Sequence, residues 1–228
     1  MRYASRMVLL GLLAAFAVGA VAASSALASP EWYVKKAGVF KKVTGPVKVN
    51  IEKNYELNTG YEEIRGKDLV VSCKGAEGIE GDLEPGGAGV ISRFQGLAGQ
   101  CKGAGSEPYC EEFTRDEGID LPWKTELYKE GSEVRNRILK GNEPAWHFTC
   151  KTWPLGEEIL TRCNVNTTTH MANNTTTGAV EAEFEKKSNK TICTVGTTSK
   201  EAGEWKGVLT VKPTESEKKA GVEAIKVE

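Results

Sequence analysis

Histidine is scarce in this 228-residue sequence, which contains only His147 and His170. Neither belongs to an H-E-x-x-H zinc motif, and the sequence has no G-x-S-x-G turn of the kind that presents a nucleophilic serine. Any chemistry that depends on an imidazole would therefore rest on these two residues alone. We predict no catalytic residue and regard both histidines as possible ligand contacts.

Metal-ligand spacing is also missing. The cysteines form no C-x-x-C pair of the type that holds zinc. Acidic side chains gather in the segment 110–120, but their spacing does not match an EF-hand calcium loop. We interpret this segment as a solvated acidic turn and predict no metal site and no cofactor. Paired carboxylates of a secreted hydrolase remain an alternative for it, because the sequence does not give their separation in space.

Only one long apolar run is present, and it lies at the N-terminus. Arg2 and Arg6 precede the run Met7–Val21, and Ala26 and Ala28 follow it with A-x-A spacing. This order of a positive segment, a short apolar segment and small residues is typical of a cleaved signal peptide. We therefore expect residues 1–28 to be a signal peptide and residues 29–228 to form a single exported β-rich domain without a transmembrane segment.

An excess of positive charge is absent as well. Arg2 and Arg6 are the charged residues of the expected leader, so the mature part has 28 basic and 31 acidic side chains and a net charge of −3. Nucleic-acid binding proteins need a basic surface that displaces counterions. We therefore expect no nucleic-acid partner. The partner is unknown, and a cell-envelope or extracellular polysaccharide is a possibility.

Six cysteines are present in the expected mature chain. An even number of cysteines in an exported chain predicts three disulfides, and six cysteines allow 15 pairings. Cys101–Cys110 and Cys150–Cys163 would close short loops and leave Cys73–Cys193 as a long-range bond, whereas Cys73–Cys101 is a strong rival. The disulfide candidates are Cys73, Cys101, Cys110, Cys150, Cys163 and Cys193.

Apolar and polar residues alternate with a period of two in many short segments. Clear examples are the segments 47–52, 145–150 and 179–184, and glycine-containing turns separate such segments. This pattern predicts antiparallel strands with one solvated face. The predicted fold class is all-β, an antiparallel sandwich or small barrel stapled by disulfides. Two segments, 132–141 and 213–224, could instead form short helices.

The segment 121–139, LPWKTELYKEGSEVRNRIL, mixes charged and aromatic residues but reads as a hairpin. With Glu130–Gly131 as the turn, Trp123 would pair with Ile138 and Leu127 with Val134 on an apolar face. The same register would place Lys124 opposite Arg137. We therefore regard these two basic residues as possible contacts for an acidic ligand.

A threonine- and asparagine-rich segment, 164–178, is almost free of large apolar residues. We interpret it as a long loop or a flat exposed edge, which a structural or adhesive surface protein could use. Tryptophans such as Trp32 and Trp153 could add a platform for carbohydrate. Trp146 and Trp205 are in phase with apolar neighbours, so we expect both in the core.

Several short motifs together carry a resemblance. EWYVKKAGVF follows the leader, VVSCKG leads to GGAGV, LPWKTELY precedes EVRNRI, and WHFTC comes next. This order resembles a loosely defined set of exported, cysteine-containing proteins of soil actinobacteria, which show an L-P-W-x-[ST]-E-L segment, an I-R pair and V-T-C. The order of the I-R pair differs here. The resemblance implies export, a bacterial source and a β-rich fold, but no activity and no site residue.

These observations favour an exported, disulfide-stabilised, non-catalytic protein that binds an unknown ligand or associates with the cell envelope. Two alternatives remain open: a secreted hydrolase that uses acidic residues, and a structural or adhesive surface protein that uses the threonine- and asparagine-rich segment.

Export predicts a defined mature N-terminus. Because small residues at −3 and −1 fit the signal peptidase pocket, protein recovered from the medium or envelope should begin at Ser29. Edman sequencing or intact mass measurement checks this, and secreted material that retains Met1 would contradict it.

Overall fold

The structure of the chain is a computed structural model. It describes residues 28–63, 67–75, 78–95, 100–103, 110–139, 141, 143–152, 156, 158–165, 167–184, 190–195 and 198–228. For a subset of these, only the backbone is described: residues 59–63, 67–69, 110–116, 152, 159, 190 and 198–202. Residues 1–27 of the expected signal peptide and Trp153 lie outside the described residues.

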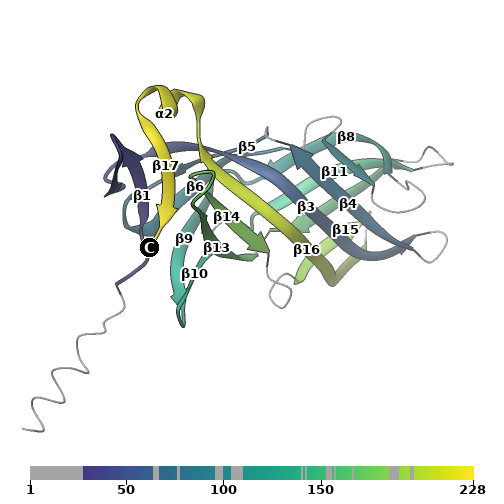
Figure 1. Ribbon diagram of the computed structural model, residues 1–228. Coiled ribbons are helices and arrows are strands. Elements are labelled where there is room, and N and C mark those ends of the chain that lie inside the picture. Colours follow the sequence, from purple (N-terminus) through teal and green to yellow (C-terminus); the bar gives the residue numbers. More distant parts are fainter. Residues whose placement is uncertain are drawn as a thin grey trace, which may run out of the picture.

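Eight antiparallel strands close into a barrel (Figure 1). Neighbours pair in the order β3-β5-β6-β9-β10-β13-β14-β16, and β16 pairs back with β3. The predicted all-β antiparallel fold is therefore confirmed, in its barrel form. The barrel strands are β3 (Val47–Glu63), β5 (Ile79–Leu83), β6 (Ala88–Phe94), β9 (Trp123–Glu130), β10 (Glu133–Ile138), β13 (Thr168–Asn174), β14 (Ala179–Phe184) and β16 (Thr198–Pro213).

The two longest strands, β3 and β16, extend beyond this barrel and carry a second set of strands. The first residues of β3 pair with β5, whereas β3 from Lys53 onward pairs with β4. In β16, residues 208–211 pair with β14 and residues 198–204 pair with β15. The second set runs β7-β4-β3-β16-β15-β12-β11-β8, and its end strands β7 and β8 contact each other. Its further members are β4 (Lys67–Gly75), β7 (Cys101–Gly103), β8 (Cys110–Ile119), β11 (Ala145–Thr152), β12 (Glu158–Asn164) and β15 (Lys190–Val195).

A small sheet lies against the opposite end of the barrel, and we call it the cap (Figure 1). Its strands run β17-β1-β2. The Asn173 side chain of β13 joins the cap to the barrel, because its amide bonds both the N–H and the carbonyl of Val227 at 2.8 Å. The short helix α2 (Glu215–Lys219) leads into β17. The cap strands are β1 (Trp32–Lys36), β2 (Val39–Lys42) and β17 (Val222–Val227).

One connected cluster of buried side chains runs through the barrel, the second set and the cap. Trp146 and Trp205 are 0% and 1% exposed, so their predicted place in the core is confirmed. Rings from three parts of the chain meet here: Tyr55 lies 5.3 Å from Trp205 and 5.9 Å from Trp146 between centroids. Burial of each such side chain stabilises the fold by about 1.5–3 kcal/mol.

A glycine permits the close approach of β3 and β16 where the two strand sets diverge. Gly207 pairs with Tyr55 and has a φ of +113°. A Cβ at this position would lie 2.2 Å from the Asn54 carbonyl oxygen. Only glycine fits here, and glycine in a long strand marks a bend or a close backbone contact.

The hairpin predicted over 121–139 forms, but its register is shifted. The turn is Gly131–Ser132, and Gly131 supplies the positive φ of 63° that the first turn position requires. Arg137 therefore lies opposite Glu126, not Lys124, and its Nε donates to Glu126 Oε1 at 2.5 Å. The shift of the register preserves the two faces, so the apolar face was predicted correctly and the pairs across it were not.

The interpretation of 164–178 as a loop or flat edge was wrong. Residues 168–174 form β13 and continue through a turn into β14. Val165, Thr167, Thr169 and Met171 are all buried. Threonine hides the alternation here, because its hydroxyl scores as polar while its branched side chain suits a half-buried strand.

Two further interpretations need correction. The acidic segment 110–120 is not a turn, because residues 110–119 form β8, paired with β11. The segment 132–141 contains strand β10 rather than a helix, whereas 213–224 does contain the helix α2. Thr214 caps α2 by accepting a hydrogen bond from the Glu217 N–H at 3.3 Å.

Two disulfides join strand pairs. Cys73 bonds Cys101 between β4 and β7, and Cys163 bonds Cys193 between β12 and β15. Both pairs lie directly opposite each other across antiparallel strands, with Cα atoms 4.1 Å apart. The rival Cys73–Cys101 pairing is thus confirmed, and the pairings Cys101–Cys110, Cys150–Cys163 and Cys73–Cys193 were wrong. Sequence proximity misled because strand register, not loop length, brings cysteines together. Cys150 is also disulfide-bonded.

Removal of a disulfide should destabilise the fold measurably. Replacing Cys163 and Cys193 together by alanine should lower the free energy of unfolding by about 3–4 kcal/mol, because the unfolded chain regains the entropy of a loop spanning 30 residues. Urea denaturation measures this. Replacing Cys73 and Cys101 together, which are 28 residues apart, should give a similar loss. A loss below about 1 kcal/mol for both pairs would contradict the entropic argument.

Candidate functional site

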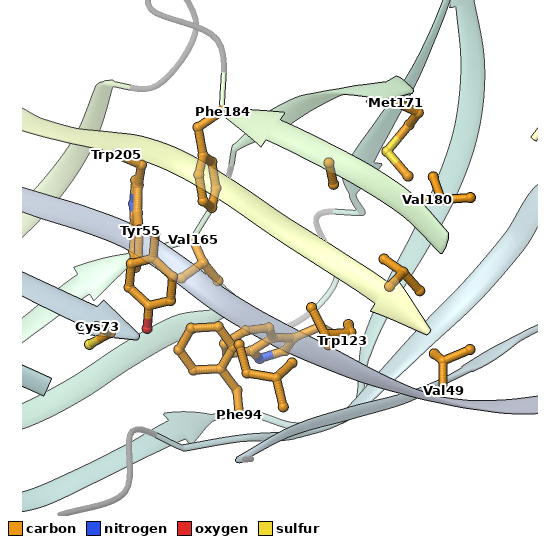
Figure 2. Packing of buried hydrophobic residues seen from close by; sticks show 14 of the residues in the cluster. Val49, Tyr55, Cys73, Phe94, Trp123, Val165, Met171, Val180, Phe184 and Trp205 are labelled. Carbon is orange, nitrogen blue, oxygen red and sulfur yellow. The ribbon is translucent and has the colours of Figure 1, made fainter. Parts of the chain in front are cut away.

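A cavity of about 90 Å³ lies inside the eight-stranded barrel. All eight barrel strands contribute to its wall, and Trp32 of the cap contributes as well. Phe94, Trp123, Phe184 and Trp205 line it on the side of the second strand set. The cavity therefore lies between the cap and the aromatic cluster. Figure 2 shows Tyr55, Trp205 and Phe184 close together, with Val49, Met171 and Val180 at a distance from them.

One part of the cavity wall is apolar, and it consists of side chains from three adjacent strands. Val49 and Ile51 project from β3, Leu209 and Val211 from β16, and Ala182 from β14. These strands are consecutive in the closed sheet, with Val211 paired to Ile51 and Leu209 to Ala182. Strand alternation places every second residue inward, so neighbouring strands in register form one continuous apolar surface.

Another part of the wall carries polar side chains, which we call the polar row. Its members are Thr125 of β9, Asn136 of β10 and Thr169 of β13. Asn136 lies directly opposite Thr169, and Thr125 is its diagonal neighbour, because Leu127 pairs with Asn136 and Thr125 with Ile138. The polar row therefore crosses three consecutive strands on the inner face of the barrel.

The polar row is poorly satisfied by the protein itself. The side chains of Thr125 and Asn136 make no hydrogen bond within the described part of the chain, although Thr125 is only 8% exposed. The Thr169 hydroxyl contacts only the Met171 sulfur, at 3.5 Å, which is a weak acceptor. Buried polar groups are normally hydrogen-bonded, so a row that lacks strong partners requires an explanation.

Trp32 lies at the cap side of the cavity and has an indole N–H without a partner in the described part of the chain. Its side chain lines the cavity, and the residue is 3% exposed. The indole Nε1–H is buried and has no hydrogen-bond partner among the described residues. Trp123, which lines the cavity on the side of the second strand set, differs because its Nε1–H donates to the Ile119 carbonyl at 2.7 Å. An indole can only donate, so a partner for Trp32 must be an acceptor.

Ionised side chains are kept off the inner wall that the structure describes. Asp82 borders the cavity, but it lies between the buried Gly81 and Leu83, so alternation places its side chain on the outer face. Lys53 is buried at 3% exposure near the aromatic end, and its Nζ donates to the Gln95 carbonyl at 2.8 Å. Lys53 does not line the cavity.

Lys42 and Glu215 have shifted pKa values, and both belong to surface pairs near the cap. The hydrogen bond with Glu31, together with its charge, raises the pKa of Lys42. The hydrogen bond with Lys218, together with its charge, lowers the pKa of Glu215. Neither group lines the cavity.

The possible ligand contacts predicted from the sequence lie outside the cavity. Lys124 is exposed on the outer face of β9, and Arg137 contacts Glu126 and lies 4.9 Å from the centre of the Tyr128 ring. His170 pairs with Arg135 on the outer face of the barrel. The structure brings none of these side chains into the cavity wall.

His147 lies on the second strand set, away from the other possible contacts. It pairs with Glu117 of β8 and Arg162 of β12, so the three form a row on one face of this sheet. Arg162 is also 3.9 Å from Glu143. Among the described residues, no group of three or more His, Cys, Asp or Glu side chains is placed to hold a metal ion.

Sequence reasoning missed the polar row, although a signal for it was present. Thr125 and Asn136 stand on the face of the hairpin that otherwise carries Trp123, Leu127 and Ile138. Along a strand, apolar inward residues normally alternate with polar outward ones. A polar residue at an inward position therefore marks either a functional site or a strand whose faces were assigned incorrectly.

Comparison with known proteins found no match among protein-family models, curated proteins or solved structures, so the function is inferred from this geometry. Among the described residues, no helix is long and apolar enough to cross a membrane.

The polar row should be replaceable without loss of stability. Thr125→Val keeps the shape of the side chain and removes a hydroxyl that has no partner within the described part of the chain, so the free energy of unfolding should stay equal or rise by about 1 kcal/mol. Thr191→Val is the matched control, because the buried Thr191 hydroxyl donates to the Asn164 carbonyl, and its loss should lower stability by about 1 kcal/mol. Urea denaturation of both variants tests this. Equal destabilisation would show that Thr125 has a protein partner after all.

Proposed function

We propose that this protein is an exported, non-catalytic binding protein that holds a small apolar molecule inside its eight-stranded barrel. The observation that carries the proposal is the cavity, which lies among the barrel strands, the cap and the aromatic cluster and is lined mainly by apolar side chains. Small-molecule sites are typically concave and apolar with a few convergent polar groups, and the mouths and interiors of β-barrels are common places for them.

The disulfides support the exported part of the proposal. Cys73–Cys101 and Cys163–Cys193 each fasten two neighbouring strands of the second set. Disulfides form and persist in oxidising compartments and are rare in the cytosol. Together with the expected signal peptide, they favour a location in the medium or at the exterior of the cell envelope.

The cavity supports binding over the two alternative functions. A hydrolase needs an acid, a base or a nucleophile beside its substrate, and the cavity wall offers apolar surface and neutral hydrogen-bonding groups. An adhesive surface would need a row of outward hydroxyls along 164–178, but Thr167 and Thr169 project inward, and the exposed threonines of this segment are confined to the turn 175–177.

The proposal is tested by filling the cavity. Ethylbenzene should bind the wild-type protein, with isothermal titration calorimetry giving one site and methyl resonances of the barrel shifting in NMR spectra. Ala182→Leu adds three carbon atoms to the apolar wall and should weaken this binding at least tenfold, because the added atoms occupy the space of the ligand.

The matched control for this test is Ala172→Leu. Ala172 lies on the neighbouring strand β13 and is exposed on the outer face, whereas Ala182 is 5% exposed on the inner face. Ala172→Leu should therefore leave the affinity unchanged. Absence of binding by ethylbenzene and by its ketone analogue acetophenone to the folded wild-type protein would count against the proposed function, and equal effects of the two leucines would refute its location.

A further inference from the structure

We propose that the ligand of the barrel is a neutral molecule that carries a hydrogen-bond acceptor, such as a ketone, ester or lactone, and that Trp32 Nε1–H donates to this acceptor. The inference rests on the proposed function and adds the chemical class of the ligand. The inference is based on three features found around one cavity: the Trp32 indole N–H without a partner, the polar row and the apolar wall.

The requirement for an acceptor comes from Trp32. A buried donor without a partner costs about 1–3 kcal/mol relative to a paired one. Trp123, which also lines the cavity, avoids this cost through the Ile119 carbonyl, so the fold is able to satisfy an indole where no ligand is needed. Trp32 lines the cavity, and its buried Nε1–H lacks such a partner among the residues that the structure describes. A ligand oxygen that accepts from Nε1, once the indole turns toward the cavity, would remove the penalty.

The polar row extends this recognition to a second position. Thr125 and Asn136 can each donate and accept, and neither side chain has a hydrogen-bond partner in the described ranges. A ligand with an ester or lactone group can offer two oxygens, one for Trp32 and one for the polar row. A saturated hydrocarbon would satisfy neither and would leave all these groups buried without partners.

The requirement for a neutral ligand comes from the missing counter-charge. No Lys or Arg side chain contributes to the cavity wall that the structure describes. Burying a carboxylate away from water without a cation costs far more than burying a carbonyl. Lys53 is the nearest candidate on the inner face of β3, but it is not part of the wall, and its Nζ is held by the Gln95 carbonyl. The site therefore favours a ketone or ester over the corresponding acid.

Three probes of similar size test this inference: ethylbenzene, acetophenone and benzoate. They share a phenyl ring and differ in having no acceptor, a neutral acceptor and an anionic acceptor. Acetophenone should bind the wild-type protein about tenfold more tightly than ethylbenzene, since it satisfies a buried donor, and benzoate should bind more weakly than acetophenone. Titration calorimetry at neutral pH measures all three.

The variant Trp32→Phe tests whether the preference for acetophenone over ethylbenzene comes from the indole N–H. The variant keeps an aromatic ring in the cap and removes the N–H, so the preference for acetophenone over ethylbenzene should fall to within about twofold while ethylbenzene still binds. Tyr33→Phe is the control, because Tyr33 follows Trp32 on β1 and does not line the cavity, so the tenfold preference should remain.

A second measurement needs no variant. In the wild-type protein, acetophenone should move the assigned Trp32 indole N–H resonance downfield, as a new hydrogen bond does, and ethylbenzene should not. Equal affinities for the two probes with an unmoved Trp32 resonance would overturn the inference and leave the proposed function standing. Benzoate that binds as tightly as acetophenone would overturn the neutral class, and absence of binding by all three would refute the proposed function itself.

Discussion

The pairing of β3 with β16 is the interaction on which the rest of the structure depends. These strands lie side by side from Val49 to Asn58, and each changes its outer neighbour along its length. At one end they close the eight-stranded barrel, and at the other end they hold the second strand set. Closure removes the open edges of the barrel sheet, and the long strands bring rings such as Tyr55, Trp146 and Trp205 into one cluster that forms the end wall of the cavity.

The interior of the barrel combines stability and binding in one set of strands. Its apolar wall stabilises the fold through burial, and the polar row and Trp32 place unsatisfied groups in the same space. Natural proteins depart from well-satisfied cores where a function requires it. The cap belongs to the same arrangement, because Asn173 holds Val227 in place and Trp32, on the strand paired with it, reaches the cavity.

Particular elements show how far the sequence could predict this arrangement. In the hairpin 121–139, alternation identified both faces, but the register depended on which residue could take a positive φ, and Gly131 decided it. In 164–178, threonine concealed a strand, because β-branched residues with hydroxyls fit either a polar loop or an inward strand face. The preferred disulfide pairing was wrong for a related reason. Neither of the two described bonds joins cysteines that lie close together in the sequence.

By itself, the sequence determined the strand character of most segments, the burial of Trp146 and Trp205, and the even number of cysteines, because alternation and composition are local properties. The tertiary structure alone decided the closure of the barrel, the pairing of Cys163 with Cys193, and the meeting of Trp32, Thr125 and Asn136 around one cavity. Inward side chains from distant strands become neighbours only when strand order and register are set, and these depend on pairings between segments far apart in the chain.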